Sequence, residues 1–216
     1  MTCIVGLIDG EDVYLGGDSA VTMGNEIAPQ KQPKVFRNGD FLMGSSGSAR
    51  IKQLLCYSFT PPKRPFAKDL ETYMATDFLN ALRKCFKDAG LARKVSEEES
   101  FLGSILIAHR GRLFNLGSHY SMHEAQCGYD AIGNGSEIAK GALYATRSLP
   151  PRERITLALE AAAEHVNYVR PPFTIEVLKG KATREPATEP EAVPALTLEE
   201  LKDVHTQPHE DEEDGA

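Results

Sequence analysis

The sequence predicts an α+β fold in which two sheets stack face to face with a layer of helices outside each. Short apolar runs occur in pairs joined by Gly- and Asp-containing turns, which is typical of antiparallel hairpins rather than of repeated β-α-β units. Along the chain, strands are followed by two helical segments, more strands, two more helices and a last strand. A chain of 216 residues with 41% hydrophobic residues can fill one such domain but is short for two.

The chain is predicted to begin with a β-hairpin. Residues 3–8 and 13–17 are apolar runs, and the DGED segment between them supplies the turn. Residues 21–37 look like further, irregular strand that ends in KVFR. The first quarter of the chain is therefore expected to be almost entirely extended.

A second hairpin leads into the first helix. The NGD at 38–40 is a turn signal, and FLMG continues after it as a strand. GSSGSA then opens a helix over 50–59, for which its serines are candidate N-caps. The breaker TPPKRP separates this helix from the next.

A long amphipathic helix is predicted from Phe66 to about Ala89. Its apolar residues recur at steps of four, a spacing that places them on one face. They are Leu70, Met74, Phe78, Leu82 and Phe86.

The second half of the chain repeats the order of strands and helices. Residues 101–108 and 112–117 form a hairpin around HRGR, and a strand lies near 127–132. GNGS begins a helix that reaches about residue 147, and PPRERI begins another that reaches about residue 166. FTIEVL, at 173–178, is the last strand.

The domain organisation follows from composition. Residues 2–180 are predicted to form the folded domain, and 181–216 an acidic, disordered tail rich in Pro, Ala, Thr and Glu. The tail holds three basic residues against eleven acidic ones, whereas the rest of the chain holds 21 against 20. In the tail, LTLEELKDV could form a helical turn or two on a partner, and a purely solubilising role is the alternative.

Composition also limits the classes of function. The nearly neutral body gives no reason to expect nucleic acid as a partner. No apolar run approaches the roughly 20 residues of a membrane span, and no secretory signal begins the chain. The four cysteines form no Cys-x-x-Cys pair, and His119 and His123 lie in a segment without a clear helical pattern. We therefore expect a reduced, cytoplasmic protein without a metal or cofactor.

A threonine directly follows the initiator methionine, and hairpin spacing places an acid beside it. With the first turn centred near residues 10 and 11, strand partners sum to about 21, so Thr2 falls opposite residue 19, give or take one. Asp18 therefore returns to the N-terminus. The NGD turn likewise places Lys34 opposite Met43, on a strand that leads into the GSSGS helix start.

These groups suit nucleophilic catalysis. If Met1 is removed, Thr2 carries its own base, because a free α-amine titrates near 7.7–8. A nearby lysine would favour the deprotonated states of its neighbours, and a carboxylate would hold the lysine. Unpaired N–H groups at the helix start could receive the negative charge of an oxyanion.

The same segments resemble the N-terminal nucleophile hydrolases of the proteasome β-subunit type, and most closely the bacterial HslV branch. The resemblance covers residues 2 to about 178, in the family's order and near its spacing. The segments that carry it are Thr2-Cys-Ile-Val-Gly6, Gly16-Gly-Asp18, Thr22-Met-Gly-Asn25, Lys34-Val-Phe36, Gly44-Ser-Ser-Gly47, Ala131-Ile-Gly-Asn-Gly135 and Thr174-Ile-Glu176.

The resemblance implies a four-layer αββα sandwich and a threonine peptidase. In it, Thr2 would be the nucleophile and, through its amine, the base, while Asp18 and Lys34 would set its protonation. The Gly47 amide would donate to the oxyanion. The remaining implied positions line the specificity pocket or support the site: Ala20, Gln32, Ser45, Ser46 and Asn134. N-capping explains at least one of the two serines equally well.

Assembly is also implied by the resemblance. Family members form stacked rings of six or seven subunits with the active sites inside, which implies a homo-oligomeric double ring that acts on peptides or unfolded proteins. HslV-type rings work with a hexameric AAA+ ATPase that unfolds the substrate.

Two departures leave other functions open. Asn134 stands where the family usually has serine, and Pro171 and Pro172 stiffen a loop that can lie near the site. The alternatives are a catalytically weak or inactive ring scaffold on the same fold, and an amide hydrolase that acts on small molecules.

Overall fold

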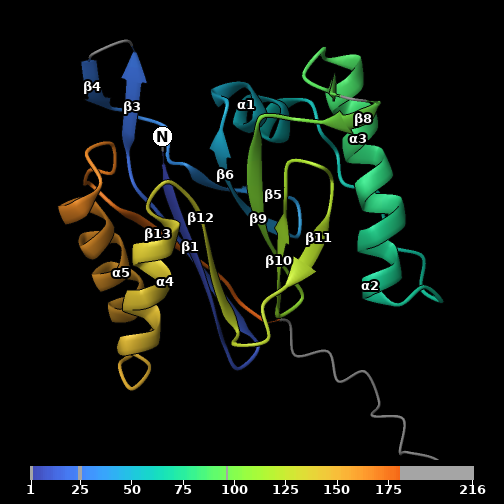
Figure 1. Cartoon of the computed structure of the whole chain (residues 1–216). Helices are drawn as coiled ribbons and strands as arrows, with labels where there is room; N and C mark the ends of the chain where they lie inside the picture. The colour runs from blue at the N-terminus through green and yellow to red at the C-terminus, as the bar shows by residue number, and fades with distance from the viewer. Residues whose placement is uncertain (1, 24–25, 96, 181–216) are drawn as a thin grey trace, which may run out of the picture. The chain divides into compact units, whose positions relative to one another are not determined.

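Two antiparallel sheets form the centre of the computed structural model, which describes residues 2–23, 26–95 and 97–180 (Figure 1). The first sheet has the strand order β12-β1-β2-β13 and the second β11-β10-β9-β6-β5. The strands of the first sheet are β1 (Cys3–Asp9), β2 (Asp12–Gly17), β12 (Tyr129–Gly133) and β13 (Thr174–Leu178). Those of the second are β5 (Val35–Asn38), β6 (Phe41–Gly47), β9 (Gly103–His109), β10 (Arg112–Leu116) and β11 (Met122–Glu124).

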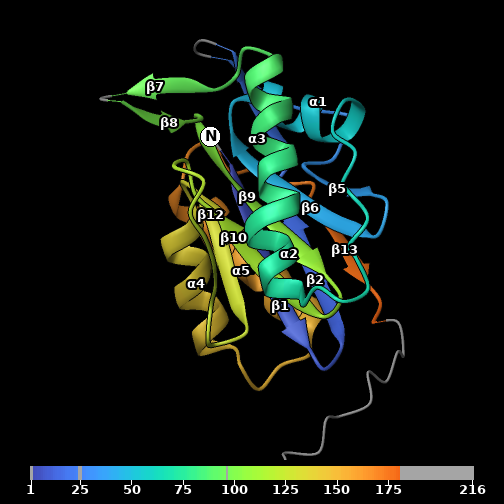
Figure 2. The same cartoon turned by 90° about the vertical axis from the view of Figure 1, so that its right-hand side faces the viewer.

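Helices cover the outer face of each sheet, as Figures 1 and 2 show from two sides. The first sheet is covered by α4 (Ser136–Ala145) and α5 (Pro151–His165). The second is covered by α1 (Ala49–Tyr57) and by a long helix made of α2 (Leu70–Tyr73), the π-helical η1 (Met74–Phe78) and α3 (Leu79–Asp88). The α+β class and the four-layer αββα arrangement are thus confirmed.

Three apolar clusters hold these layers together. The cluster between the sheets is centred on Ile4, Leu15, Leu42 and Leu106, all without exposed surface. Alternation along β1 sends Cys3 to the cluster under α4 and α5 instead. Both faces of this strand are therefore buried, which explains why residues 3–8 read as a continuous apolar run.

The long helix begins later than its apolar pattern predicts. The side chain of Asp69 accepts a hydrogen bond from the Thr72 amide at 2.8 Å, so Asp69 is the N-cap and the helix starts at Leu70. Apolar residues at strict steps of four drift around a regular α-helix of 3.6 residues per turn. The wider π turn at 74–78 offsets this drift, so that Met74, Phe78 and Phe86 all stay buried.

Two short hairpins were not predicted as separate elements. They are β3 (Ala20–Met23) with β4 (Glu26–Pro29), and β7 (Arg93–Val95) with β8 (Glu98–Ser100). Strands of three or four residues with few buried side chains leave no clear alternation in the sequence. No helix among the described residues is long and apolar enough to cross a membrane. The predicted tail at 181–216 lies outside the described residues.

Candidate active site

The first hairpin brings Asp18 back to the start of β1, as its spacing predicts. Ile4 pairs with Gly17 and Asp9 with Asp12, so the partners sum to 21 and the turn consists of Gly10 and Glu11. Beyond the last pair, the Asp18 amide donates to the Cys3 carbonyl at 3.3 Å. A two-residue turn thus fixes the register at the N-terminal end of the sheet.

The Asp18 carboxylate is buried and bound on both oxygens. Its Oδ1 accepts from the Cys3 amide at 2.9 Å, and its Oδ2 accepts from the Ala20 amide at 3.0 Å. The Lys34 ammonium lies 2.9 Å from each of the same oxygens. The carboxylate is therefore fixed in orientation by two strands and neutralised by one cation.

Lys34 links this carboxylate to the threonine hydroxyl. Its Nζ donates to Thr2 Oγ1 at 3.0 Å, and both residues are buried. Burial lowers the pKa of Lys34, and this effect exceeds the opposing attraction of Asp18. A buried ammonium beside a hydroxyl oxygen favours its deprotonated form, which is the nucleophilic one.

The predicted partner of Lys34 is wrong by two residues. Phe36, not Lys34, pairs with Met43, because the second turn lies at Gly39 and Asp40, with Asn38 paired to Phe41. Gly39 has a φ of +59°, the left-handed conformation that such a turn requires. Continuing this register places Lys34 level with Ser45.

The two serines belong to a strand and not to a helix cap. Ser45 and Ser46 are buried in β6, while Ser48 is the N-cap of α1 and accepts from the Arg50 amide at 3.3 Å. The capping interpretation is therefore wrong for both. The strand ends at Gly47, because the φ of +92° at this residue departs from the extended conformation.

The end of β6 lies close to Thr2, with Gly133 of β12 between them. A Cβ atom at Gly133 would lie 2.2 Å from the Thr2 carbonyl oxygen and 3.4 Å from Ser46 Cβ. At Gly47, a Cβ would lie 2.3 Å from the Leu102 carbonyl oxygen, so glycine is required there. Strands from both sheets thus converge on one end of the sandwich.

The other predicted site residues differ in their contacts with Thr2, Asp18 and Lys34 and the segments around them. The amide of Ala20 binds Asp18, as described, and the carbonyl of Gln32 accepts from Lys52 Nζ at 3.2 Å. The Asn134 side chain is exposed, and the next amide, that of Gly135, donates to the Thr2 carbonyl at 3.5 Å. At position 134, therefore, the backbone and not the side chain approaches Thr2.

The proline-containing loop is anchored beside the site, a contact that the sequence did not predict. The Arg170 carbonyl accepts from the Ser19 amide at 3.1 Å and from the Ser19 hydroxyl at 3.4 Å. The Arg170 guanidinium in turn donates to the carbonyls of Ala163 and Val169, both at 2.9 Å. The end of α5 is thereby tied to the residue that follows Asp18.

The thiol of Cys3, next to Thr2, is expected to be unreactive. Cys3 has no exposed surface, and burial, with a smaller contribution from Asp18, raises its pKa to about 12. A thiol with that pKa stays protonated near neutral pH and is a poor nucleophile. The Cys3 thiol is therefore not a strong competing nucleophile beside Thr2.

Two other groups of polar residues lie away from Thr2. His119 and His123 face different carboxylates, Glu98 at 3.7 Å and Asp130 at 3.8 Å, and the described residues contain no group of three or more His, Cys, Asp or Glu that could hold a metal. Asp130 pairs with Gly6, well along β1 from Thr2.

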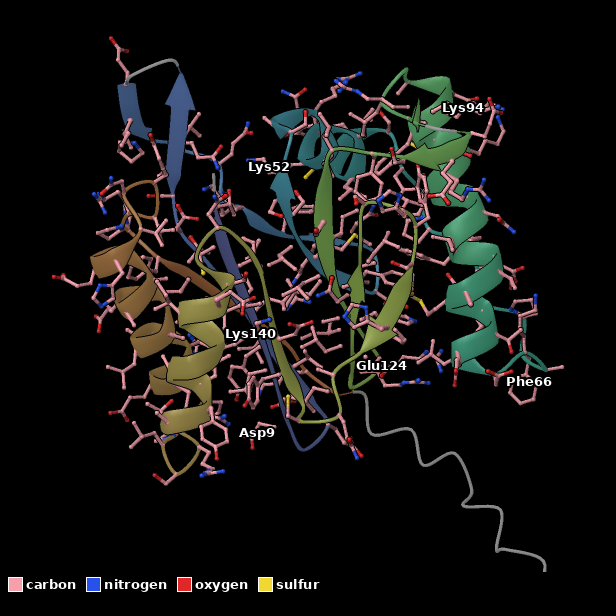
Figure 3. The ribbon with its side chains drawn as sticks, viewed as in Figure 1. Asp9, Lys52, Phe66, Lys94, Glu124 and Lys140 are labelled. Carbon is pink, nitrogen blue, oxygen red and sulfur yellow. The ribbon has the colours of Figure 1, made fainter. Side chains whose placement is uncertain are left out.

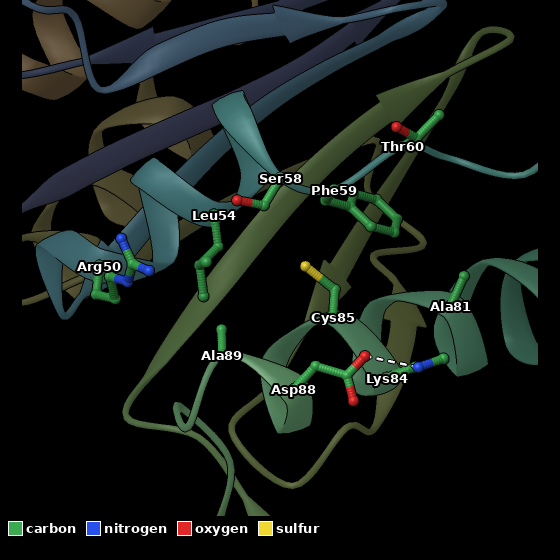
Figure 4. Close-up of a pocket in the computed structure, with 10 residues that line it drawn as sticks. All are labelled: Arg50, Leu54, Ser58, Phe59, Thr60, Ala81, Lys84, Cys85, Asp88 and Ala89. Carbon is green, nitrogen blue, oxygen red and sulfur yellow. Dashed lines mark hydrogen bonds and ion pairs between the residues drawn. The ribbon is translucent and has the colours of Figure 1, made fainter.

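A separate groove of about 450 Å³ lies between α1 and α3 (Figure 4).

The arrangement of the layers is that of the N-terminal nucleophile hydrolase fold. Solved structures with this fold include BPH of Thiobacillus denitrificans, at a TM-score of 0.71 and 23% identity over 84% of this chain and all of that one. HslV from Trypanosoma brucei has a TM-score of 0.58 and 19% identity, over 81% of this chain and 98% of that one.

Sequence comparison finds similarity to a proteasome β-subunit. No family model matches the chain. The proteasome subunit beta of Methanocaldococcus fervens is 28% identical over 167 residues, which cover 74% of this chain and 72% of the relative. The chain is thus similar in sequence to a proteasome β-subunit, and it shares the fold of BPH and HslV.

Proposed function

We propose that the protein is a threonine-type endopeptidase that uses Thr2, exposed by removal of Met1, as its nucleophile. One observation carries this proposal: the Lys34 ammonium donates to Thr2 Oγ1 at 3.0 Å while both oxygens of Asp18 hold it. The two Asp18 oxygens take two of the three N–H donors of the buried Lys34 ammonium, and Lys34 directs the third at the Thr2 hydroxyl oxygen. Its contact with Thr2 is the geometry that an activated hydroxyl needs.

The reaction follows from these contacts. The Thr2 α-amine takes the hydroxyl proton, and Oγ1 attacks the carbonyl carbon of the substrate peptide bond. The C–N bond then breaks, the amine proton passes to the leaving amine, and an ester to Thr2 remains. Water hydrolyses this ester by the same route, which returns the proton to Oγ1. Lys34 stays protonated throughout and stabilises the negative charge that develops on Oγ1.

The backbone amide of Gly47 is the proposed donor to the oxyanion. Gly47 is the exposed last residue of β6, at the entrance to the site, which we call its mouth. It follows Ser46, which lies near Thr2 with Gly133 between them. A preorganised amide at this place would stabilise the tetrahedral intermediate. Ser45, Ser46, Ala20 and Gln32 are proposed to line the substrate pocket, and Asn134 to support it through the backbone.

The proposed assembly is a homo-oligomeric double ring of six or seven subunits per ring, in the cytoplasm. Similarity to a proteasome subunit beta in sequence and to HslV in fold supports it. Peptides or unfolded proteins are the proposed substrates, with an AAA+ unfoldase as a candidate partner.

Mass spectrometry of the full-length protein, before and after treatment with epoxomicin, tests the peptidase. BPH of Thiobacillus denitrificans has been solved in complex with epoxomicin, which makes this compound a suitable probe. We expect a mass without Met1, a covalent adduct on Thr2, and cleavage of fluorogenic peptides that the Thr2→Ala variant lacks. Retained Met1 in active protein would contradict the mechanism.

The same samples separate the alternatives. A ring that assembles but is never labelled at Thr2 would support the inactive scaffold. A labelled protein that hydrolyses only small acyl amides, in a screen set against a peptide library, would support the amide hydrolase.

A further inference from the structure

A lysine that the proposed chemistry does not use lies beside the catalytic group. Lys52 is on α1, and Figure 3 shows it on the side of the helix that faces the start of β1. Its Nζ donates to the carbonyls of Gln32 at 3.2 Å and Pro33 at 3.4 Å, and to the side-chain Oε1 of Gln30 at 3.3 Å. The segment that binds Lys52 is thus the one that leads directly into Lys34.

These three contacts do not neutralise the ammonium. All three acceptors are uncharged oxygens. Their distances from Lys52 Nζ are all longer than the roughly 2.7–2.9 Å that is typical of an ammonium bound to a carboxylate. Burial lowers the pKa of Lys52; the nearby Cys56 opposes this shift, and the Lys34 ammonium adds a smaller lowering. The charge of Lys34 is already matched by Asp18, whereas Lys52 forms no ion pair with any residue that the structure describes.

The surrounding sequence adds no acid at this end of the fold. Between residues 27 and 62 there is one acidic residue, Asp40, against the basic residues Lys31, Lys34, Arg37, Arg50 and Lys52. Asp40 and Arg37 both lie at the opposite end of the β5–β6 hairpin from Ser46: Asp40 is in the turn before β6, and Arg37 pairs with Leu42 and donates to the Val177 carbonyl. At the end that holds Thr2, this stretch of the chain therefore contributes basic residues, among them Lys34 and Lys52, and no acid.

The segment that Lys52 binds lies beside the proposed nucleophile. Its acceptors precede Lys34, whose Nζ is 3.0 Å from the nucleophilic oxygen, and Pro33 lies level with the buried Ser46 when the register of β5 and β6 is continued. The substrate residue whose carbonyl is attacked becomes bonded to Thr2. Its side chain therefore projects into the region that these residues line.

We propose that Lys52 determines specificity, and that the enzyme prefers peptides with Asp or Glu immediately before the bond that is cleaved. This inference rests on the proposed function. A substrate carboxylate would replace the Gln30 side-chain oxygen on the Lys52 ammonium, while the two backbone carbonyls keep the ammonium in place. The exchange turns a long contact with a neutral amide into a charge-assisted hydrogen bond.

Four peptide epoxyketones that differ only in the residue before the reactive group, Glu, Gln, Lys or Leu, test the proposal on the full-length protein. Glu and Gln have the same shape, so the ratio of their labelling rates at Thr2 isolates the charge. We expect a ratio of about ten or more for the wild type. Lys52→Gln should bring it to about one, and Lys52→Glu should make the Lys probe faster than the Glu probe.

Two further variants make the test specific. Gln30→Glu places a carboxylate of the protein on Lys52 and should also bring the ratio to about one, without removing the lysine. Lys84 is exposed on α3 and paired with Asp88, so Lys84→Gln should leave the ratio unchanged.

The outcomes separate the two proposals. Thr2 labelled equally by the Glu and Gln probes would overturn the specificity inference and leave the peptidase intact. A Lys52→Gln variant that slows all four probes equally would show that Lys52 only ties the 30–33 segment to α1, which also overturns it. Failure of every probe on wild-type protein lacking Met1 would overturn the proposed function itself.

Discussion

Both carboxylate oxygens of Asp18 lie 2.9 Å from the Nζ atom of Lys34. The same Nζ also contacts Thr2 Oγ1 at 3.0 Å. Because the amides of Cys3 and Ala20 hold the two carboxylate oxygens, the position of the ammonium is fixed by the backbone of the first sheet. Asp18 is therefore expected to act on Thr2 through Lys34.

Replacing Asp18 by Asn should affect stability and activity together. The amide keeps the shape of the side chain but leaves the Lys34 charge buried and unmatched, and it turns an N–H group toward a backbone donor. Breaking one side of a buried ion pair costs about 3–5 kcal/mol. We expect a decrease of that size in the free energy of unfolding, measured with urea at several protein concentrations, and a loss of Thr2 labelling by about 100-fold or more.

The exposed pair between Asp12 and Lys179 is the matched control. Their contact of 2.6 Å lies on the surface, where solvent screens it. Asp12→Asn should therefore change neither the unfolding free energy nor the labelling rate appreciably. Equal effects of the two substitutions would show that Asp18 is not special to the site.

Lys34 should produce an alkaline limit to activity. Burial lowers the pKa of Lys34 from its usual 10.5, so the ammonium that binds Thr2 is lost at a lower pH than in an exposed lysine. Between the lowered pKa and 10.5, the unfolded state holds more protons than the folded state. The contribution of Lys34 to the unfolding free energy therefore rises with pH in that window, while the labelling rate falls. Rate profiles and urea titrations between about pH 7 and 10.5 measure both trends.

Arginine at position 34 tests the assignment of that limit. Its guanidinium has a pKa above about 12 and stays charged over the whole range. We expect Lys34→Arg to be slower, because the planar group cannot keep all three contacts of the ammonium, but to show no alkaline decrease. An unchanged alkaline limit in this variant would assign the titration to another group.

How far the sequence alone reaches can be judged from individual residues. Asp18 returns to Thr2 through a local hairpin, so turn chemistry and strand alternation were enough to place it. The contact between Lys34 and Thr2 joins residues that directly precede strands of two different sheets, and spacing along one hairpin does not reach across them. Family resemblance supplied that contact, and the spacing argument for Lys34 misplaced its partner by two residues.

Residues that act through packing between elements left no signal. Lys52 lies in a helix where a lysine is normally a surface residue, and only the packing of α1 against the 30–33 segment reveals its contacts. The anchoring of Ser19 by the Arg170 carbonyl spans 151 residues of sequence. Contacts of this kind depend on the final arrangement of layers, which no local pattern encodes.

The cysteines offer a test of which nucleophile is available at the N-terminus. Because burial raises the pKa of Cys3 to about 12, its thiol should resist iodoacetamide at pH 8 in the folded protein. The exposed Cys127 should react readily under the same conditions. Peptide mapping by mass spectrometry measures the alkylation of both cysteines. In urea, which unfolds the protein, the two should react at equal rates. Rapid alkylation of Cys3 in the native state would contradict the burial on which the choice of Thr2 partly depends.

A methyl group at Gly47 should disrupt the mouth of the site more than the fold. Its Cβ would lie 2.3 Å from the Leu102 carbonyl oxygen, and the φ of +92° is strained for any other residue, so we expect Gly47→Ala to lower the unfolding free energy by about 1–3 kcal/mol. The backbone must move to relieve the clash, which displaces the proposed oxyanion donor and should reduce labelling by about 100-fold or more. Gly10 also has a positive φ, of +59°, but a Cβ there meets nothing within 4 Å. Gly10→Ala should therefore cost some stability and leave labelling unchanged, measured by urea unfolding and probe kinetics on both variants. Full labelling by a folded Gly47→Ala protein would exclude the Gly47 amide as the donor, since a shifted amide could not serve unchanged.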